Sequence, residues 1–127
     1  MPISVSLDRA DPPTGVVALS GEQDAYSAPR LENELSALLD EGMGLVVDLT
    51  GAAFLDSQSL SLLLAACRRA ERSSLGFTVV LPREPYTQVH RILDITGLIG
   101  AFAFYPALVP ALAGARAGRN GGHARAA

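Results

Sequence analysis

Residues 45–60 read Leu-Val-Val-Asp-Leu-Thr-Gly-Ala-Ala-Phe-Leu-Asp-Ser-Gln-Ser-Leu, and this stretch decides how the rest of the chain is interpreted. Its first part, residues 45–49, is a short apolar run with one acid, which is typical of a strand buried in a mixed sheet beside helices. Its last part, residues 54–60, contains the polar run Asp-Ser-Gln-Ser at the point where an apolar strand ends and an apolar helix begins. The N–H groups of a first helical turn lack partners within the helix and favour acceptors or anions. Ser57 is therefore the first candidate for a regulatory modification.

Regular patterns on both sides of this stretch predict alternating strands and helices. The spacing of apolar residues, and the Gly, Pro and polar residues that separate the apolar segments, predict a hairpin, four helices and three further strands. The predicted order is strands at 3–7 and 16–19, a helix at 28–41, a strand at 45–49, a helix at 57–72, a strand at 77–81, a helix around 89–93 that ends at Gly97, a strand at 101–104 and a helix at 107–113. This order predicts an α/β fold, a small mixed sheet of about four to five strands flanked by about four α-helices.

Length and composition describe a single domain. The 127 residues, 49% of them hydrophobic, are enough for one core. We expect residues 1–113 to form this domain. Residues 114–127 are rich in Gly, Ala and Arg and poor in large apolar side chains, so we expect a disordered C-terminal tail.

The charge and the apolar pattern exclude several classes of partner. The chain has no Lys, and residues 1–113 hold seven Arg against thirteen acidic residues, a formal charge of −6. Affinity for nucleic acid comes mostly from Lys and Arg, so we expect no direct nucleic acid partner. No apolar run approaches the ~20 residues of a membrane span, the N-terminus does not resemble a secretory signal, and the single cysteine, Cys67, allows no internal disulfide. We expect a cytoplasmic protein with no membrane partner.

The reactive side chains do not form a catalytic or metal-binding pattern. His90, His123 and Cys67 fall in different predicted segments, without the spacing of metal ligands. His90 has no nearby acid at a telling spacing, and Asp48 and Asp56 lie on different elements. Cys67 lies on the apolar face of its predicted helix and is interpreted as a small core residue. We expect no catalytic residue, no metal, no cofactor and no enzymatic activity.

The pair Asp56-Ser57 has two interpretations. Either residue suits the N-cap of the following helix, a role that contributes about 1 kcal/mol. Alternatively, Ser57 carries a phosphate, which uses the same unpaired N–H groups. The local pattern alone favours the cap. Ser59 and Ser61 are most simply exposed or back-bonded helix residues, and each is also a candidate secondary phosphorylation site.

The polar turn and its surroundings resemble a known family. The apolar run at 45–49, followed by Phe54-Leu55-Asp56-Ser57 and a Leu-rich helix, resembles the signature of STAS domains, in particular of bacterial anti-sigma factor antagonists. Two further landmarks occur in the family's order: Gly21-Glu22-x-Asp24 with Ala28-Pro29, and Val89-x-x-Ile92-Leu93-x-x-x-Gly97-Leu98. The resemblance covers almost the whole folded region and implies a single STAS-like domain.

The resemblance also implies a function. Ser57 matches a serine that is phosphorylated by a partner that is both an anti-sigma factor and a serine protein kinase, and a protein phosphatase reverses the modification. The unphosphorylated antagonist binds the anti-sigma factor, which releases a sigma factor. The residues that the resemblance places at the partner-binding surface are Asp24, Asp56, Ser57, Gln58 and Ser59.

The motif departs from the family at one position. Members commonly carry Asp-Ser-Ser/Thr-Gly, whereas Gln58 and Ser59 follow Ser57 here. A side chain at position 59 removes the backbone freedom and the close approach that Gly offers. Two alternatives therefore stay open: a constitutive STAS scaffold, and a regulatory subunit, for example of a transporter, that is not phosphorylated.

Overall fold

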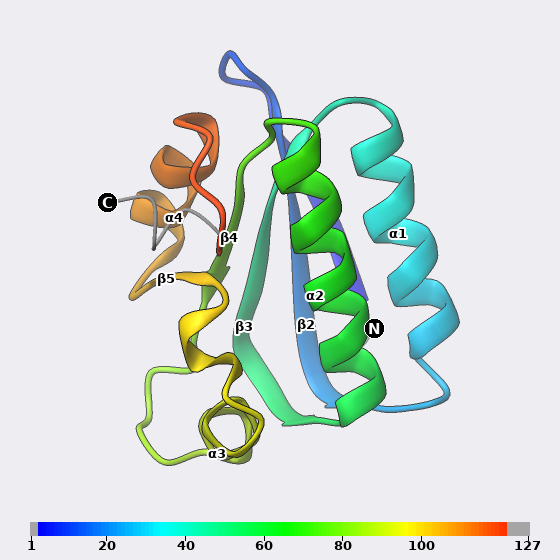
Figure 1. Ribbon diagram of the computed structural model, residues 1–127, viewed down its shortest axis with the longest axis vertical. Helices are drawn as coiled ribbons and strands as arrows, with labels where there is room; N and C mark the ends of the chain where they lie inside the picture. The colour runs from blue at the N-terminus through cyan, green and yellow to red at the C-terminus, as the bar shows by residue number, and fades with distance from the viewer. Residues whose placement is uncertain (1–2, 122–127) are drawn as a thin grey trace.

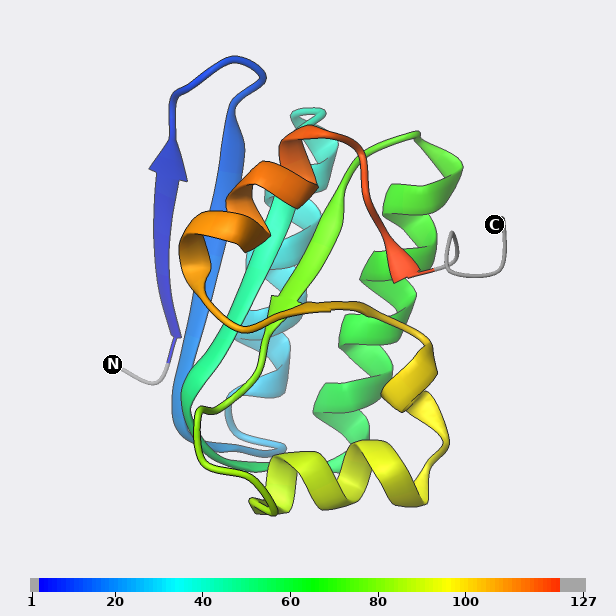
Figure 2. The same cartoon turned by 90° about the vertical axis from the view of Figure 1, so that its left-hand side faces the viewer.

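The computed structural model describes residues 3–121, which form a five-stranded mixed sheet with helices on both faces (Figures 1 and 2). The strands lie in the order β1-β2-β3-β4-β5; β1 is antiparallel to β2 and the other neighbours are parallel. Their bounds are Ile3–Asp8, Thr14–Gln23, Gly44–Leu55, Phe77–Val80 and Ala103–Tyr105. The predicted α/β fold with four to five strands is confirmed.

Four α-helices surround the sheet. They are α1 (Ala28–Asp40), α2 (Ser57–Arg72), α3 (Gln88–Ile95) and α4 (Leu108–Arg116), with a short 3-10 helix at Leu98–Gly100. Figure 1 shows α1 and α2 side by side on one face of the sheet, α4 on the other face, and α3 beside the lower end of β3.

The alternation of side chains along the strands produces one core on each face. Val17, Leu45 and Val47 face α1 and α2 in the larger cluster, while their neighbours Val16 and Val46 pack with Ala111 and Ala115 of α4. This two-sided burial explains why residues 45–49 form a continuous apolar run, as expected for a strand covered on both faces.

Glycines end α1 and α3 where the sequence predicts. Gly42 and Gly97 have positive φ values of 77° and 75°, a conformation that glycine adopts without steric cost. Gly97 N donates to Asp94 O at 3.0 Å, and Leu98 packs against the cluster that contains Leu93.

Two strands run further than their apolar patterns indicate. β2 continues through Gln23, past the predicted strand end at residue 19, and β3 continues through Leu55, past the predicted end at residue 49. The added segments pair with each other, with register shifts after Ala18 and Gly21. Most of their side chains are exposed, so this part of the sheet has no apolar run that would reveal it.

The folded domain also extends past residue 113, so the expected start of a disordered tail at 114 is wrong. α4 continues to Arg116, and Asn120 is buried. Phe77 N donates to Arg119 O at 2.7 Å, which joins the C-terminal segment to β4.

Small residues allow this segment to pack without large apolar side chains. A Cβ placed on Gly76 would lie 2.0 Å from Ala115 O, so only glycine permits the approach. Disorder was expected because large apolar side chains are scarce in this segment. The close packing of its backbone could not be foreseen from that scarcity. The remaining part of the expected tail, residues 122–127, lies outside the described residues.

Candidate functional site

The residues predicted for partner binding lie where the parallel strands end. β2, β3 and β4 all run toward the lower end of the sheet in Figure 1, where the β2–α1 loop, the β3–α2 connection and α3 lie. In open α/β sheets, ligands and partners commonly bind outside the carboxyl ends of the strands. This end is the candidate site.

Asp56 joins β3 to α2 and caps the helix. Its Oδ1 accepts a hydrogen bond from Ser59 N at 2.8 Å, and its backbone is extended, as an N-cap requires. On its other side, Asp56 N donates to Gln23 O at 3.1 Å. The capping interpretation is therefore confirmed for Asp56, and Ser57 is not the cap.

Ser57 is the first residue of α2, and its side chain is exposed. The following side chain, Gln58, is exposed as well. Both belong to the first helical turn, whose N–H groups make no intrahelical hydrogen bond. The Ser57 hydroxyl is thus accessible to a macromolecule at a helix start, where N–H groups suit an anion and where Asp56 already accepts from one of them, Ser59 N.

Ser59 does not occupy the position expected of it. Its side chain is 0% exposed, and its Oγ is without a hydrogen-bond partner among the described residues. Ser59 therefore does not offer its side chain to a partner, and the expectation of an exposed or back-bonded residue is wrong as well. The helical spacing of Ser59, Leu63, Ala66 and Ala70 places position 59 on the buried stripe of α2, which is the signal that its polar character obscured.

Asp24 follows the last residue of β2 and organises the next turn. Its Oδ1 accepts from Tyr26 N at 3.0 Å, and its carbonyl oxygen accepts from the N–H groups of Ser27 and Ala28. Gln23 pairs with Leu55 in the sheet, so Asp24 and Asp56 follow residues that are opposite each other on neighbouring strands. The structure thus brings these two predicted acids to adjacent strand ends.

Sequence reasoning missed Gln88, the first residue of α3. Its Oε1 accepts from Leu55 N at 2.8 Å and its Nε2 donates to Leu55 O at 3.0 Å. The amide therefore holds the residue that precedes Asp56. No local signal reveals this contact, because 33 residues separate the two partners.

Three exposed aromatic side chains lie at the same end of the molecule and were also missed. Tyr26 is in the β2–α1 loop, Phe54 near the end of β3, and Tyr86 in the loop before α3, with exposed fractions of 96%, 39% and 84%. Aromatic residues are enriched in protein interfaces. Their exposure at the end of the molecule that holds Ser57 favours a protein-binding surface there.

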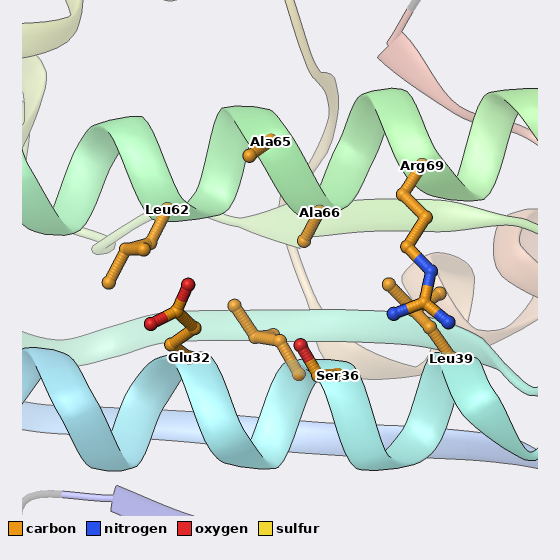
Figure 3. A pocket seen from close by; sticks show the side chains of 8 residues that line it. Glu32, Ser36, Leu39, Leu62, Ala65, Ala66 and Arg69 are labelled. Carbon is orange, nitrogen blue, oxygen red and sulfur yellow. The ribbon is translucent and has the colours of Figure 1, made fainter.

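The groove between α1 and α2 offers little room for a ligand (Figure 3). It has a volume of about 110 Å³, and its apolar lining includes Leu35, Leu39 and Leu62. Ala65 and Ala66 leave the gap because their side chains are small, while Glu32, Ser36 and Arg69 line its edges. Small-molecule sites usually measure roughly 300–1,000 Å³, so this groove does not favour one.

The other reactive side chains, those of Cys67 and His90, contact other parts of the fold. Cys67 is buried in the core, which confirms its interpretation as a core residue, and this burial raises the pKa of its thiol. His90 Nδ1 lies 2.7 Å from Thr87 Oγ1, the hydroxyl that caps α3.

Within residues 3–121, no group of three His, Cys, Asp or Glu side chains is arranged to hold a metal ion. None of the helices in this range has the length and apolar character of a membrane span.

The fold defines the class of protein: a small α/β domain of the STAS type. A family model described as "Mlab, STAS domain" matches residues 6–110. The chain belongs to the STAS domain family, and its curated relatives place it among the anti-sigma factor antagonists.

Two curated relatives and one solved structure support this assignment. The chain is 35% identical to the anti-sigma-F factor antagonist RsfB of Mycobacterium tuberculosis over 121 residues, 93% of this chain and 95% of that one. It is 31% identical to the anti-sigma-B factor antagonist of Listeria monocytogenes over 101 residues, 77% and 84% of the two chains. The crystal structure of an anti-sigma factor antagonist from Mycobacterium paratuberculosis matches with a TM-score of 0.74 and 35% identity, covering 90% of this chain and 94% of that one.

Proposed function

We propose that this protein is a phosphorylation-controlled antagonist of an anti-sigma factor. The chain binds a kinase-type anti-sigma factor while Ser57 is unmodified, and a sigma factor is thereby released. The same partner phosphorylates Ser57, which ends the complex, and a protein phosphatase restores it. The protein acts through binding rather than catalysis, without a cofactor, in the cytoplasm. The observation that carries the proposal is the exposed Ser57 at the start of α2, directly after the capping Asp56.

The helix can accommodate the phosphate that the proposal requires. A phosphoserine adds a charge of about −1.5 to −2 at pH 7. At the first position of α2 this charge meets the positive end of the helix dipole and the N–H groups of the first turn. The fold is therefore expected to survive phosphorylation, so that the modification acts on the binding surface.

The same phosphate changes the surface that a partner meets. Asp56 and Asp24 already place carboxylates at neighbouring strand ends, and a phosphate on Ser57 concentrates negative charge there. A partner that packs closely on the unmodified turn would have to bury this charge. Moving a complex from 99:1 to 1:99 requires about 5.5 kcal/mol of differential affinity, a magnitude that breaking a buried charge contact can reach.

The departure from the family motif at Ser59 does not oppose this proposal. Position 59 lies inside α2, where the backbone is helical and does not require glycine. Because the Ser59 side chain faces the core, it also leaves the surface around Ser57 unchanged.

The test is phosphorylation of the purified chain by its cognate kinase-type anti-sigma factor with ATP, followed by intact-mass and peptide analysis. We expect one phosphate on Ser57, none in Ser57→Ala, and normal modification of the matched control Ser61→Ala, whose exposed serine lies four residues further along α2. A phosphate on another residue, or none on the wild type, contradicts the proposal. Equal partner binding by the wild type, Ser57→Ala and Ser57→Asp would favour a constitutive scaffold instead.

A further inference from the structure

β3 extends beyond the strand that lies next to it. β4 pairs with β3 only at residues 45–48 and ends at Val80, whereas β3 continues to Leu55. The far part of β3 therefore extends past β4 on that side. The chain after β4 forms a loop and then α3, which Figure 1 shows beside the lower end of β3.

The side chain of Gln88 supplies the hydrogen bonds that a neighbouring strand would make. Its amide accepts from Leu55 N at 2.8 Å and donates to Leu55 O at 3.0 Å, so one side chain satisfies both backbone groups of one residue. A primary amide is suited to this pairing because it carries an acceptor and a donor on adjacent atoms.

β2 holds the backbone of Leu55 and Asp56 from the other side. Leu55 pairs with Gln23 in the parallel sheet, and the next N–H, that of Asp56, donates to Gln23 O at 3.1 Å. The Leu55 side chain is 0% exposed, which fixes it in the core. The backbone that precedes Asp56 and Ser57 is thus held by hydrogen bonds to β2 and to Gln88, and by the burial of the Leu55 side chain in the core.

The attachment of α3 does not depend on Gln88 alone. Val89 and Leu93 are 0% and 1% exposed and pack the helix onto the main core. Replacing Gln88 should therefore leave α3 in place while it frees the backbone of Leu55. The two contributions of α3, packing and fastening, can be separated by mutation.

We propose that Gln88 is a positioning residue for Ser57: its side-chain amide fixes the Leu55 backbone, so that Asp56 caps α2 and the Ser57 hydroxyl has one defined orientation for phosphoryl transfer. This inference rests on the proposed function, because it assigns Gln88 a role in the modification of Ser57. It adds a residue from α3 to a switch otherwise formed by β2, β3 and α2.

The experiment compares three variants with the wild type. Gln88→Met keeps a similar length without either hydrogen bond, and Gln88→Glu keeps the acceptor but places a carboxylate against Leu55 O. Val89→Ala is the matched control, since it weakens the packing of the same helix and leaves the amide intact. For each protein we would measure the melting temperature, the hydrogen exchange of the Leu55 amide, and kcat/KM for phosphorylation of Ser57 by the cognate kinase-type anti-sigma factor.

We expect Gln88→Met, which loses the acceptor for Leu55 N, to exchange the Leu55 amide faster. Gln88→Met and Gln88→Glu, which both lose the donor to Leu55 O, should lower kcat/KM by about 10- to 100-fold, as a misplaced reacting group does. Val89→Ala should lower the melting temperature and still be phosphorylated like the wild type well below that temperature. Wild-type kcat/KM in Gln88→Met, or an unchanged Leu55 exchange rate, overturns the positioning role alone. A wild-type chain that accepts no phosphate instead contradicts the proposed function, and the positioning role with it.

Discussion

At the scale of single residues, Asp56 and Ser59 share one hydrogen bond, but their side chains change the stability of α2 in opposite directions. Asp56 Oδ1 satisfies Ser59 N, whereas the hydroxyl of Ser59 is buried and, within residues 3–121, has no hydrogen-bond partner. A buried polar group without a hydrogen bond costs roughly 1–3 kcal/mol. The cap therefore stabilises the start of α2, while the Ser59 side chain weakens it.

Replacing Ser59 with Ala is expected to stabilise the protein. The change removes the unsatisfied hydroxyl and keeps Cβ, so the free energy of unfolding should rise by about 1 kcal/mol. Urea unfolding of wild type and Ser59→Ala measures the effect. Ser61→Ala serves as the control, because it alters an exposed serine of the same helix and changes little except helix propensity. A gain no larger than that of Ser61→Ala would show that the Ser59 hydroxyl is satisfied in solution.

The cap is tested by two substitutions of Asp56. Asp56→Ala removes the acceptor for Ser59 N and should lower the free energy of unfolding by about 1 kcal/mol. Asp56→Asn retains a side-chain oxygen and should keep most of this stability. Chemical denaturation of both variants measures the difference. Equal losses in the two variants would mean that the charge of Asp56, rather than its capping hydrogen bond, stabilises the helix.

At the scale of elements, the helices could be predicted from the sequence more fully than the ends of the strands. α2 begins at Ser57 and ends at Arg72 as predicted, because its cap, its apolar period and its last-turn arginines are all local signals. The far ends of β2 and β3 are polar and are held by pairing with each other, which no local pattern encodes. Gln88 was missed for the same reason, since its role depends on a partner 33 residues away.

In the candidate site, too, some residues could be predicted from the sequence and others could not. The sequence pointed to Asp24, Asp56, Ser57 and Gln58, which the structure places at adjacent strand ends and at the start of α2. It erred on Ser59, where residue polarity was given more weight than helical spacing. The exposed aromatic residues Tyr26 and Tyr86 were missed because exposure depends on loop placement and not on residue type.

At the scale of the whole molecule, the two ends of the sheet lie beside different segments of the chain. The carboxyl ends of the parallel strands hold the Ser57 turn, while the opposite end is closed by the C-terminal segment. There Arg116 forms an ion pair with Asp8, and Arg119 O accepts from Phe77 N. These contacts join the C-terminal segment to the edge strand β1 and to the inner strand β4.

Truncation tests the contribution of that segment. A chain that ends at residue 113 loses the end of α4 and leaves Phe77 N without its partner, so we expect its free energy of unfolding to fall by more than about 2 kcal/mol. A chain that ends at residue 121 is the matched control and should unfold like the full-length protein. Thermal and urea unfolding of the three chains measure this. Equal stability of the 1–113 chain and the control would show that residues 114–121 are not part of the folded domain.

The central claim is that one phosphate on Ser57 separates this protein from its anti-sigma factor. The most direct measurement is the Kd for the cognate anti-sigma factor of the unmodified chain and of the chain phosphorylated at Ser57, by calorimetry in the same buffer. We predict tight binding by the unmodified chain and an affinity lower by at least about 100-fold, near 2.7 kcal/mol, for the phosphorylated chain. Equal affinity of the two forms would contradict the account.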